Sequence, residues 1–230
     1  DAFPGASVAR MDLDTTRTNG AYERIIDDFA AGRTDVLIGT QMISKGLDFD
    51  RVSVVGILDA DSMMNYPDFR AYEHAYMMMA QVSGRAGRKG GRGLVVLQTK
   101  SPDAPLIGQV TRGDTEAIYR DLLAERQAFG YPPYTHLAYV YMKHRDDSLI
   151  DHAAAEMGAL LRRWFGSRVL GPDRPAVARV KALCIRKIVL KLELGIDMAK
   201  ARRYLREAQR LIAGDARFRS VQVYFDVDPM

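Results

Sequence analysis

The chain is poor in cysteine, and its single thiol, Cys184, limits what the protein can contain. One cysteine excludes an internal disulfide and a cysteine-rich zinc site, and it is typical of a reducing cytoplasm. No apolar run approaches the roughly 20 residues that a membrane span needs, and no basic-then-apolar secretory signal opens the chain. The four histidines lack metal-ligand spacing. We therefore expect a soluble cytoplasmic protein with no metal and no membrane contact.

A second absence concerns phosphate chemistry. No Gly-rich loop ending in Gly-Lys-Ser or Gly-Lys-Thr occurs in the sequence. The chain nevertheless carries the segment 81–88 (QVSGRAGR) downstream of the segment 39–50 (GTQMISKGLDFD), and this pair is the pattern of the second half of a nucleic-acid motor's ATP site. The first residue is Asp1 rather than Met, as expected of an excised piece. These features predict a part of a motor rather than a whole one.

The charge is distributed unevenly. Residues 1–150 carry 17 Lys and Arg against 20 Asp and Glu, whereas residues 151–230 carry 16 against 9, so a net −3 precedes a net +7. The overall +4 hides this difference. A basic excess in the C-terminal third indicates either a polyanion partner or a solvated basic surface.

The hydrophobic pattern divides the chain into two parts. Up to about residue 104, strand and helix signals alternate, with an unbroken apolar strand predicted to be buried at 35–40, which favours a parallel α/β layer. A helical stretch at 104–129 then leads to Gly130-Tyr-Pro-Pro-Tyr134, which cannot continue a helix and is a candidate boundary. Beyond it, strands and two helices, 147–165 and the basic 199–213, predict a small antiparallel sheet with helices on one face, an α+β sandwich.

The two arginines of the first motif suit phosphoryl transfer. Arg85 and Arg88 are three residues apart, so on a helical turn both guanidinium groups project from one face. Gly84 and Gly87 remove side chains between them and allow another surface to approach. A planar, permanently charged donor stabilises the charge that develops on a γ-phosphate. The alternative is a basic helix end with glycine caps, which Gln81 and the upstream segment make less favoured.

The upstream segment begins where a predicted strand ends, and ligand sites of parallel α/β sheets lie at such ends. Thr40, Gln41 and Lys45 are candidate donors to a nucleic-acid backbone. Gly46 allows close backbone approach, and Asp48 is a candidate partner for a ribose hydroxyl or for the arginines. The alternative is a simple loop with a helix cap.

The basic C-terminal residues form two groups. The first is a strand region comprising Arg179, Lys181, Arg186, Lys187 and Lys191. The second is spaced to lie on one side of the last helix and comprises Arg202, Arg203, Arg206 and Arg210. Contact with nucleic-acid phosphates, docking of an acidic protein tail and a merely solvated face are three open interpretations.

Several segments of the sequence resemble a known family. The segment 35–49 (DVLIGTQMISKGLDF), with Leu58–Asp61, Pro67–Ala71 and the 81–88 motif, closely resembles the primosomal protein N′ (PriA) family of superfamily 2 replication-restart helicases. Residues 10–16, Tyr131–Tyr134 and the terminal 225–229 (FDVDP) resemble it as well. Small departures exist, because Leu47 stands where the family often has His and residues 18–20 replace a frequent Lys-Gly.

The resemblance implies two domains with different roles. Residues 1–130 would be the second RecA-like helicase lobe, and residues 135–230 the family's small DNA-binding C-terminal domain. Gly46, Asp48, Gln81, Arg85 and Arg88 would face ATP with its Mg²⁺, which the missing phosphate-loop lobe would mainly hold. The segment after the predicted strand, with Thr40, Gln41 and Lys45, would couple the state of the bound ATP to DNA binding. The zinc of the complete family members would lie outside this chain.

The resemblance also implies function and partners. We expect part of a bacterial, cytoplasmic, monomeric 3′–5′ DNA helicase that binds branched and single-stranded DNA, single-strand DNA-binding protein and other primosome proteins. Alone, the chain should not hydrolyse ATP. One alternative is an autonomous module that docks nucleic acid or single-strand-binding protein without ATPase activity. Another is a non-helicase translocase with the same motifs, which the resemblance after residue 130 argues against.

Overall fold

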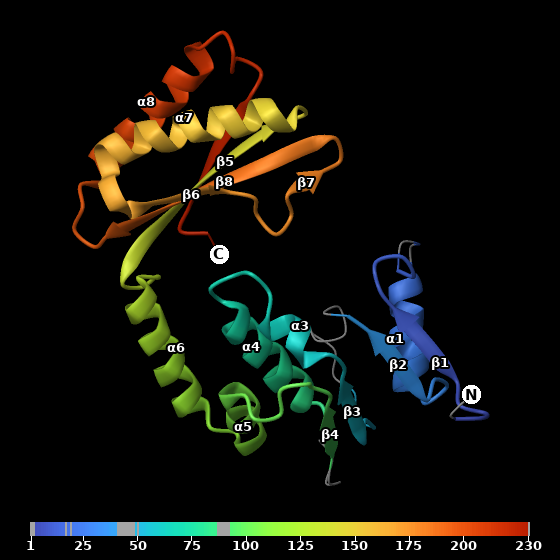
Figure 1. The fold of residues 1–230 in the computed structure, drawn as a ribbon. Helices are drawn as coiled ribbons and strands as arrows, with labels where there is room; N and C mark the ends of the chain where they lie inside the picture. The colour runs from blue at the N-terminus through green and yellow to red at the C-terminus, as the bar shows by residue number, and fades with distance from the viewer. Residues whose placement is uncertain are drawn as a thin grey trace. The chain divides into compact units, whose positions relative to one another are not determined.

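The computed structural model describes residues 3–16, 18, 20–40, 49, 51–86 and 93–229, and Figure 1 shows its elements. By its internal contacts the chain divides into two compact units, Asp1–Arg120 and Asp121–Met230. The division falls inside the helix α6 (Thr115–Phe129), whereas the break predicted at residues 130–135 follows that helix; the predicted domains stay a prediction. No helix in the described residues is long and apolar enough to cross a membrane.

The first unit consists of parallel strand pairs with helices. Strand β1 (Val8–Met11) pairs with β2 (Val36–Gly39), and β3 (Val54–Ile57) pairs with β4 (Leu94–Leu97), both in parallel. The helices are α1 (Ala21–Ala30), α3 (Ala60–Met64), α4 (Ala71–Ser83) and α5 (Pro105–Arg112), followed by α6. Parallel strands with intervening helices are what the alternating pattern predicted, so the α/β class is confirmed for this unit.

Strand β2 is less buried than its unbroken apolar run predicted. Leu37 packs with α1 around Met11, but Val36 and Ile38 are 39% and 51% exposed. Successive strand residues point to opposite faces, and α1 covers only the face that carries Leu37. The prediction of a fully buried strand at residues 35–40 was therefore wrong for its other face.

A short helix that the pattern did not predict, α3, follows β3. Asp59 begins it as the N-cap, with a left-handed φ of 53° and a side chain that accepts the Ser62 N–H at 3.3 Å. Asp61 accepts the Lys100 N–H at 2.8 Å and the Thr99 hydroxyl at 3.1 Å, and the Lys100 bond lowers the pKa of its carboxyl. These carboxylates therefore shape a turn, and in the described residues no group of acidic, His or Cys side chains could hold a metal ion.

The second unit is an antiparallel sheet covered by two helices. Its elements are β5 (Thr135–His144), α7 (Asp147–Phe165), β6 (Val169–Asp173), β7 (Arg179–Val180), β8 (Leu183–Glu193), α8 (Met198–Gly214) and β9 (Gln222–Val227). The strand order is β6-β8-β5-β9, with β7 paired to β8, and α7 and α8 lie on the same side of the sheet (Figure 1). The predicted α+β sandwich is confirmed.

The core of this unit lies between the sheet and those helices. Alternate residues of β5 and β8, such as Val140 and Ile188, are fully buried against α7 and α8. Helix α7 begins at the Asp146 cap, which accepts the Leu149 N–H at 2.9 Å, and it ends at Gly166 with φ 61°. One sheet face is thus committed to the core, and the register of β5 against β8 decides which residues are left on the other face.

The chain end is fastened to β5 by Asp228. Its side chain accepts the Leu137 N–H at 2.9 Å and contacts His136 Nδ1 at 3.0 Å, while its own N–H donates to the Leu137 carbonyl at 2.8 Å. Its φ of 48° lies in the left-handed region, which Asp tolerates better than most residues. The terminal FDVDP segment therefore has a structural role at this position.

Replacing Asp228 should destabilise the second unit. We expect Asp228→Ala to lower the free energy of unfolding by about 1–2 kcal/mol, because two side-chain contacts are lost and Ala is strained at this φ. Asp228→Asn should cost less, since Asn tolerates the backbone and keeps an acceptor. Denaturant unfolding followed by circular dichroism measures this. The exposed Asp226→Ala on the same strand is the matched control, and an equal loss in that control would contradict the assignment.

Candidate nucleotide and nucleic-acid sites

The described part of the arginine motif lies at the end of α4. Gln81 is exposed on the last helical turn, and Gly84 is the C-cap with ordinary helical dihedrals. Arg85 follows in a turn, its N–H donating to the Val82 carbonyl at 3.0 Å. The buried side of α4 carries Ala75 and Met79, so the opposite side of its last turn presents Gln81 to a surface outside the unit's core.

Several predicted site residues lie outside the described residues, namely Gln41, Lys45, Gly46, Asp48 and Arg88. Thr40 is described: it is exposed and comes directly after β2, at the carboxyl end of that strand. The shared face of Arg85 and Arg88 therefore stays a prediction. The roles of these residues toward ATP and DNA stay predictions.

The structure separates the basic strand residues that the sequence had grouped together. Arg186 and Lys187 are adjacent on β8 and point to opposite faces of the sheet, as neighbouring strand residues must. Lys187 shares the face of Tyr141, its register partner on β5, whereas Arg186 lies on the face covered by the helices. Arg179 and Lys181 are exposed at the β7–β8 hairpin, where Lys181 has φ 54°.

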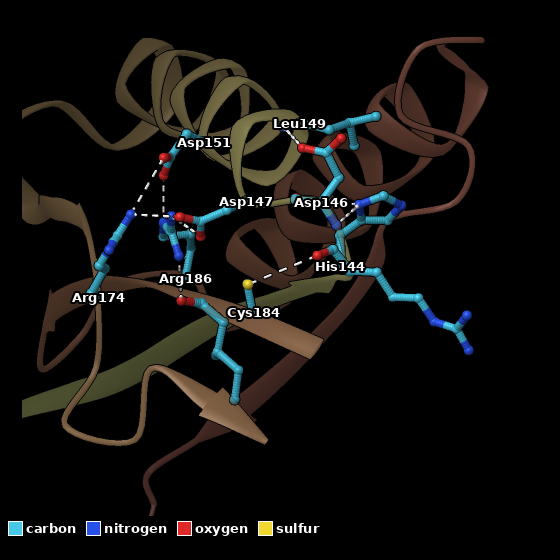
Figure 2. Close-up of polar contacts among 10 residues, drawn as sticks. His144, Asp146, Asp147, Leu149, Asp151, Arg174, Cys184 and Arg186 are labelled. Atoms are coloured by element: carbon cyan, nitrogen blue, oxygen red, sulfur yellow. Dashed lines mark hydrogen bonds and ion pairs between the residues drawn. The ribbon is translucent and has the colours of Figure 1, made fainter. Parts of the chain in front are cut away.

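Arg186 does not present its charge to solvent, which corrects its prediction as a DNA contact. Its side chain is only 3% exposed, and Figure 2 shows it between Asp147 and Asp151 of α7. It donates to Asp147 Oδ1 at 2.7 Å and to Asp151 Oδ1, and its remaining Nη1 donates to the Ile185 carbonyl at 3.0 Å. Arg174 contacts Asp147 Oδ2 at 2.8 Å. The cluster joins β8 to the first turns of α7, and the two carboxylates neutralise the charge of Arg186 inside the unit.

The ammonium group of Lys191 also has its contacts within the unit. Its ammonium donates to the Phe129 carbonyl at 2.6 Å and lies 3.8 Å from the centroid of the Tyr131 ring, and burial lowers its pKa. It therefore fastens the turn after α6 to β8. The Tyr131–Tyr134 segment, like Asp228, serves the packing of this unit.

The arginines of α8 lie on one exposed side of the helix, as their spacing predicted. Ala201, Leu205 and Ile212 face the core, and the opposite side of the helix carries exposed arginines: Arg202, Arg203, Arg206 and Arg210. Arg210 is paired with Glu207 at 2.6 Å. Within the described residues, Arg202, Arg203 and Arg206 have no ion pair. This arginine face is the strongest concentration of unneutralised charge on the second unit's helices.

Comparison with known proteins bears on both units. The family model described as "Helicase conserved C-terminal domain" matches residues 4–90, and the model "Primosomal protein N C-terminal domain" matches residues 127–230. A protein named Replication restart protein PriA from Treponema pallidum is 38% identical over 231 residues, covering 99% of this chain and 34% of that protein. The chain belongs to the PriA family.

Other PriA relatives agree. Those from Bacillus subtilis and Haemophilus influenzae are 40% and 34% identical and cover 78% and 99% of the chain. The chain spans only 22–34% of the length of these three PriA proteins. Among solved structures, the C-terminal domain of the DEAD-box protein Dbp5 has a TM-score of 0.32 at 23% identity, covering 49% of this chain and 58% of that chain, too low a score to add to the assignment.

A group of tyrosines in the PriA C-terminal domain was not predicted from the sequence. Tyr139 and Tyr141 on β5 and Tyr224 on β9 lie on the sheet face that α7 and α8 leave uncovered, where Lys143 and Lys187 also lie. The signal that could have found them is the alternation along residues 138–143, in which Tyr, Tyr and Lys occupy every second position. Alternation alone did not reveal that β9 would add a third tyrosine.

The Arg186 cluster predicts a specific pH dependence of stability. The hydrogen bonds from Arg186 hold the pKa of Asp147 and of Asp151 below their usual value. Groups with a depressed folded-state pKa stabilise the fold above their unfolded pKa of about 4, and this stabilisation is lost as pH falls through the folded value. The double variant Asp147→Asn/Asp151→Asn should therefore melt at a lower temperature at neutral pH, and its deficit should shrink as the solution is acidified.

Melting curves from neutral pH to about pH 3, followed by circular dichroism, test this expectation. Asp226→Asn, an exposed carboxylate away from the cluster, is the control and should track the unmodified chain. A difference in melting temperature between the double variant and the unmodified chain that stays constant with pH would contradict this. It would show that the two carboxylates do not stabilise Arg186 through their charge.

Proposed function

We propose that this chain is the C-terminal part of an ATP-dependent 3′–5′ DNA helicase that restarts replication at stalled or branched forks in the bacterial cytoplasm. The observation that carries the proposal is the presence, on one chain, of matches to both the helicase C-terminal model and the primosomal C-terminal model. The relatives named for replication restart support it, although the chain covers a minor part of their length.

In this proposal the first unit supplies half of an ATP site. Arg85 or Arg88 acts as the finger that stabilises charge on the transferred phosphate, with Gln81, Gly46 and Asp48 beside the nucleotide. The exposed position of Gln81 and the turn at Arg85 directly after α4 fit a motif that serves a nucleotide held by another lobe. ATP with Mg²⁺ would be held mainly there, because this sequence has no phosphate loop. Zinc has no ligand set among the described residues.

The second unit supplies a DNA grip. Arg202, Arg203 and Arg206 project from α8 away from the core and suit phosphate contacts, which are independent of base sequence and fit recognition of fork shape. Arg179 and Lys181 at the β7–β8 hairpin add charge at a separate place, and Thr40, Gln41 and Lys45 would couple the ATP state to DNA. Partners of the complete monomeric protein would include single-strand DNA-binding protein and other primosome proteins.

A second candidate function is an autonomous docking module without ATPase activity. The observation that favours it is the separate core of the second unit, which its own sheet and helices complete. The arginine face on α8 could then bind the carboxylates of an acidic protein tail as well as phosphates, since guanidinium groups suit both.

Titration of labelled fork DNA with the chain, followed by fluorescence anisotropy at several salt concentrations, tests the DNA grip. We expect Arg202→Ala/Arg203→Ala to weaken binding and to make the plot of log affinity against log salt shallower by about 1–2, since each phosphate contact contributes about 0.9. Arg186→Met, checked for folding, is the control that removes a charge already paired inside the unit and should leave the slope unchanged. Absence of fork binding, or equal slopes for both variants, would favour the protein-docking function.

The purified chain should show no DNA-stimulated ATP hydrolysis, because half of the ATP site is missing from it. A coupled ATPase assay with and without single-stranded DNA measures this. Hydrolysis that disappears in Arg85→Ala would contradict the half-site assignment, since it would show a complete catalytic site within these residues.

A further inference from the structure

The face of the second unit's sheet opposite α7 and α8 carries an aromatic cluster. Because Ala138, Val140 and Met142 of β5 point to the core, Tyr139, Tyr141 and Lys143 point to the other face. The register places Tyr141 between Tyr224 of β9 and Lys187 of β8. We call Tyr139, Tyr141, Tyr224, Lys143 and Lys187 the tyrosine–lysine platform.

The rings of the platform contact one another in defined geometries. Tyr141 and Tyr224 are stacked, with ring centroids 5.1 Å apart and planes inclined by 16°. Tyr139 meets Tyr141 edge to face at 6.0 Å. Tyr224 is 40% exposed although it lies within a paired strand. Ring–ring contacts fix the orientation of Tyr224, so an exposed aromatic surface is held in place at low entropic cost.

Lysine ammonium groups lie over these rings. Lys143 Nζ is 4.7 Å from the Tyr224 centroid, and Lys187 Nζ is 3.4 Å from the Tyr139 centroid and 5.7 Å from that of Tyr141. Both lysines have flexible stems and reach the face from neighbouring strands. The platform therefore combines fixed rings with positive charges beside them, which is the pairing that a stacked base and its phosphate require.

We propose that the tyrosine–lysine platform binds single-stranded nucleic acid, with a base stacked on Tyr224 and the flanking phosphates paired with Lys143 and Lys187. Stacking of a base on an aromatic ring is stronger than a cation–π contact at an exposed site. A base can therefore displace Lys143 from the ring, and the displaced ammonium then pairs with a phosphate. Duplex DNA does not fit this role, because its bases are not available for stacking on a protein ring.

Two carboxylates limit the path that a bound nucleic-acid strand can take across this face. Asp226 of β9 lies opposite Tyr139 on this face, and Asp173 of β6 is the register partner of Lys187. Phosphates should avoid both, so the backbone is expected to pass Lys143 and to reach Lys187 on the side away from Asp173. The carboxylates of an acidic peptide could pair with the same lysines but not stack on the rings, whereas every nucleotide carries both a phosphate and a base. Nucleic acid is therefore the favoured occupant.

The platform is distinct from the arginine face on α8, because α8 covers the opposite side of the sheet. The proposal deepens the proposed DNA grip and rests on it only for the class of partner. The two surfaces differ in chemistry. The arginines on α8 can bind phosphates of DNA in any structure, whereas the platform requires an unpaired base.

Anisotropy titration of the complete chain with fluorescein-labelled oligothymidine of about 15 nucleotides, near the upper site size of single-strand binders, tests the platform. An abasic oligomer of the same length is the comparison probe. We expect Tyr224→Leu to weaken oligothymidine binding about 5- to 150-fold, the range that stacking of one base supports, and to leave abasic binding unchanged. Tyr224→Phe, which keeps the ring, should bind as the unmodified chain does.

A second variant and a second probe separate the possible outcomes. Arg202→Ala/Arg203→Ala should weaken both oligomers equally, so failure of the helix grip and failure of the platform are distinguishable. If the unmodified chain binds abasic and thymidine oligomers equally, or if Tyr224→Leu binds oligothymidine normally, the proposal is wrong, and the first comparison needs no variant to fold. A fluorescent acidic peptide that binds in a Tyr224-dependent way, where oligothymidine does not, would instead assign the face to a protein tail.

Discussion

The antiparallel pairing of β5 with β8, from Thr135↔Glu193 to His144↔Cys184, is the constraint on which the second unit depends. Every side chain of these two central strands is assigned to one face or the other by this register, and a slip of one residue would exchange the faces. The register sends Val140, Ile188 and their alternates into the core beneath α7 and α8. It sends the tyrosines and lysines to the opposite face and leaves Arg186 among the helices, where Asp147 and Asp151 compensate its charge.

This sorting separates three kinds of positive charge in the C-terminal unit. Arg186 is structural, since it ties the sheet to α7, and Lys191 fastens the turn after α6. Arg202, Arg203 and Arg206 project from the outer side of α8. Lys143 and Lys187 lie over tyrosine rings on the sheet face opposite α7 and α8. In the functions that we propose, the arginine face binds phosphates of any DNA and the platform binds unpaired bases, and both occur together at a fork.

Much of the fold could be predicted from the sequence, because its signals are local. The period of 3.6 along residues 147–165 matches α7, and the glycine at 84 marks the end of α4. The short helix α3 was missed because it is fixed by the Asp59 cap rather than by periodicity. The exposure of β2 was missed because burial depends on which layers cover a strand, a fact of tertiary structure.

The candidate sites were predictable to different degrees. The arginine face on α8 follows from helical spacing alone. Grouping Arg186 with Lys187 failed because charge was counted along the chain, whereas a strand divides neighbouring residues between two faces. The platform could not be predicted because Tyr224 reaches Tyr141 only through the pairing of β9 with β5. On the nucleotide side, the roles of the motif residues stay predictions, and of those residues the structure describes Thr40, Gln81 and Arg85.

The most direct test of this account is photo-cross-linking of the unmodified chain to a fork whose single-stranded arm contains iodouracil, followed by mass-spectrometric mapping of the linked peptides. Iodouracil reacts preferentially with aromatic side chains that stack on it. We expect the linked residues to be Tyr224 and Tyr141, and we expect the same label placed in the duplex arm not to link to them. Cross-links confined to other tyrosines, or equal linking from the duplex arm, would contradict a sheet face that reads unpaired bases.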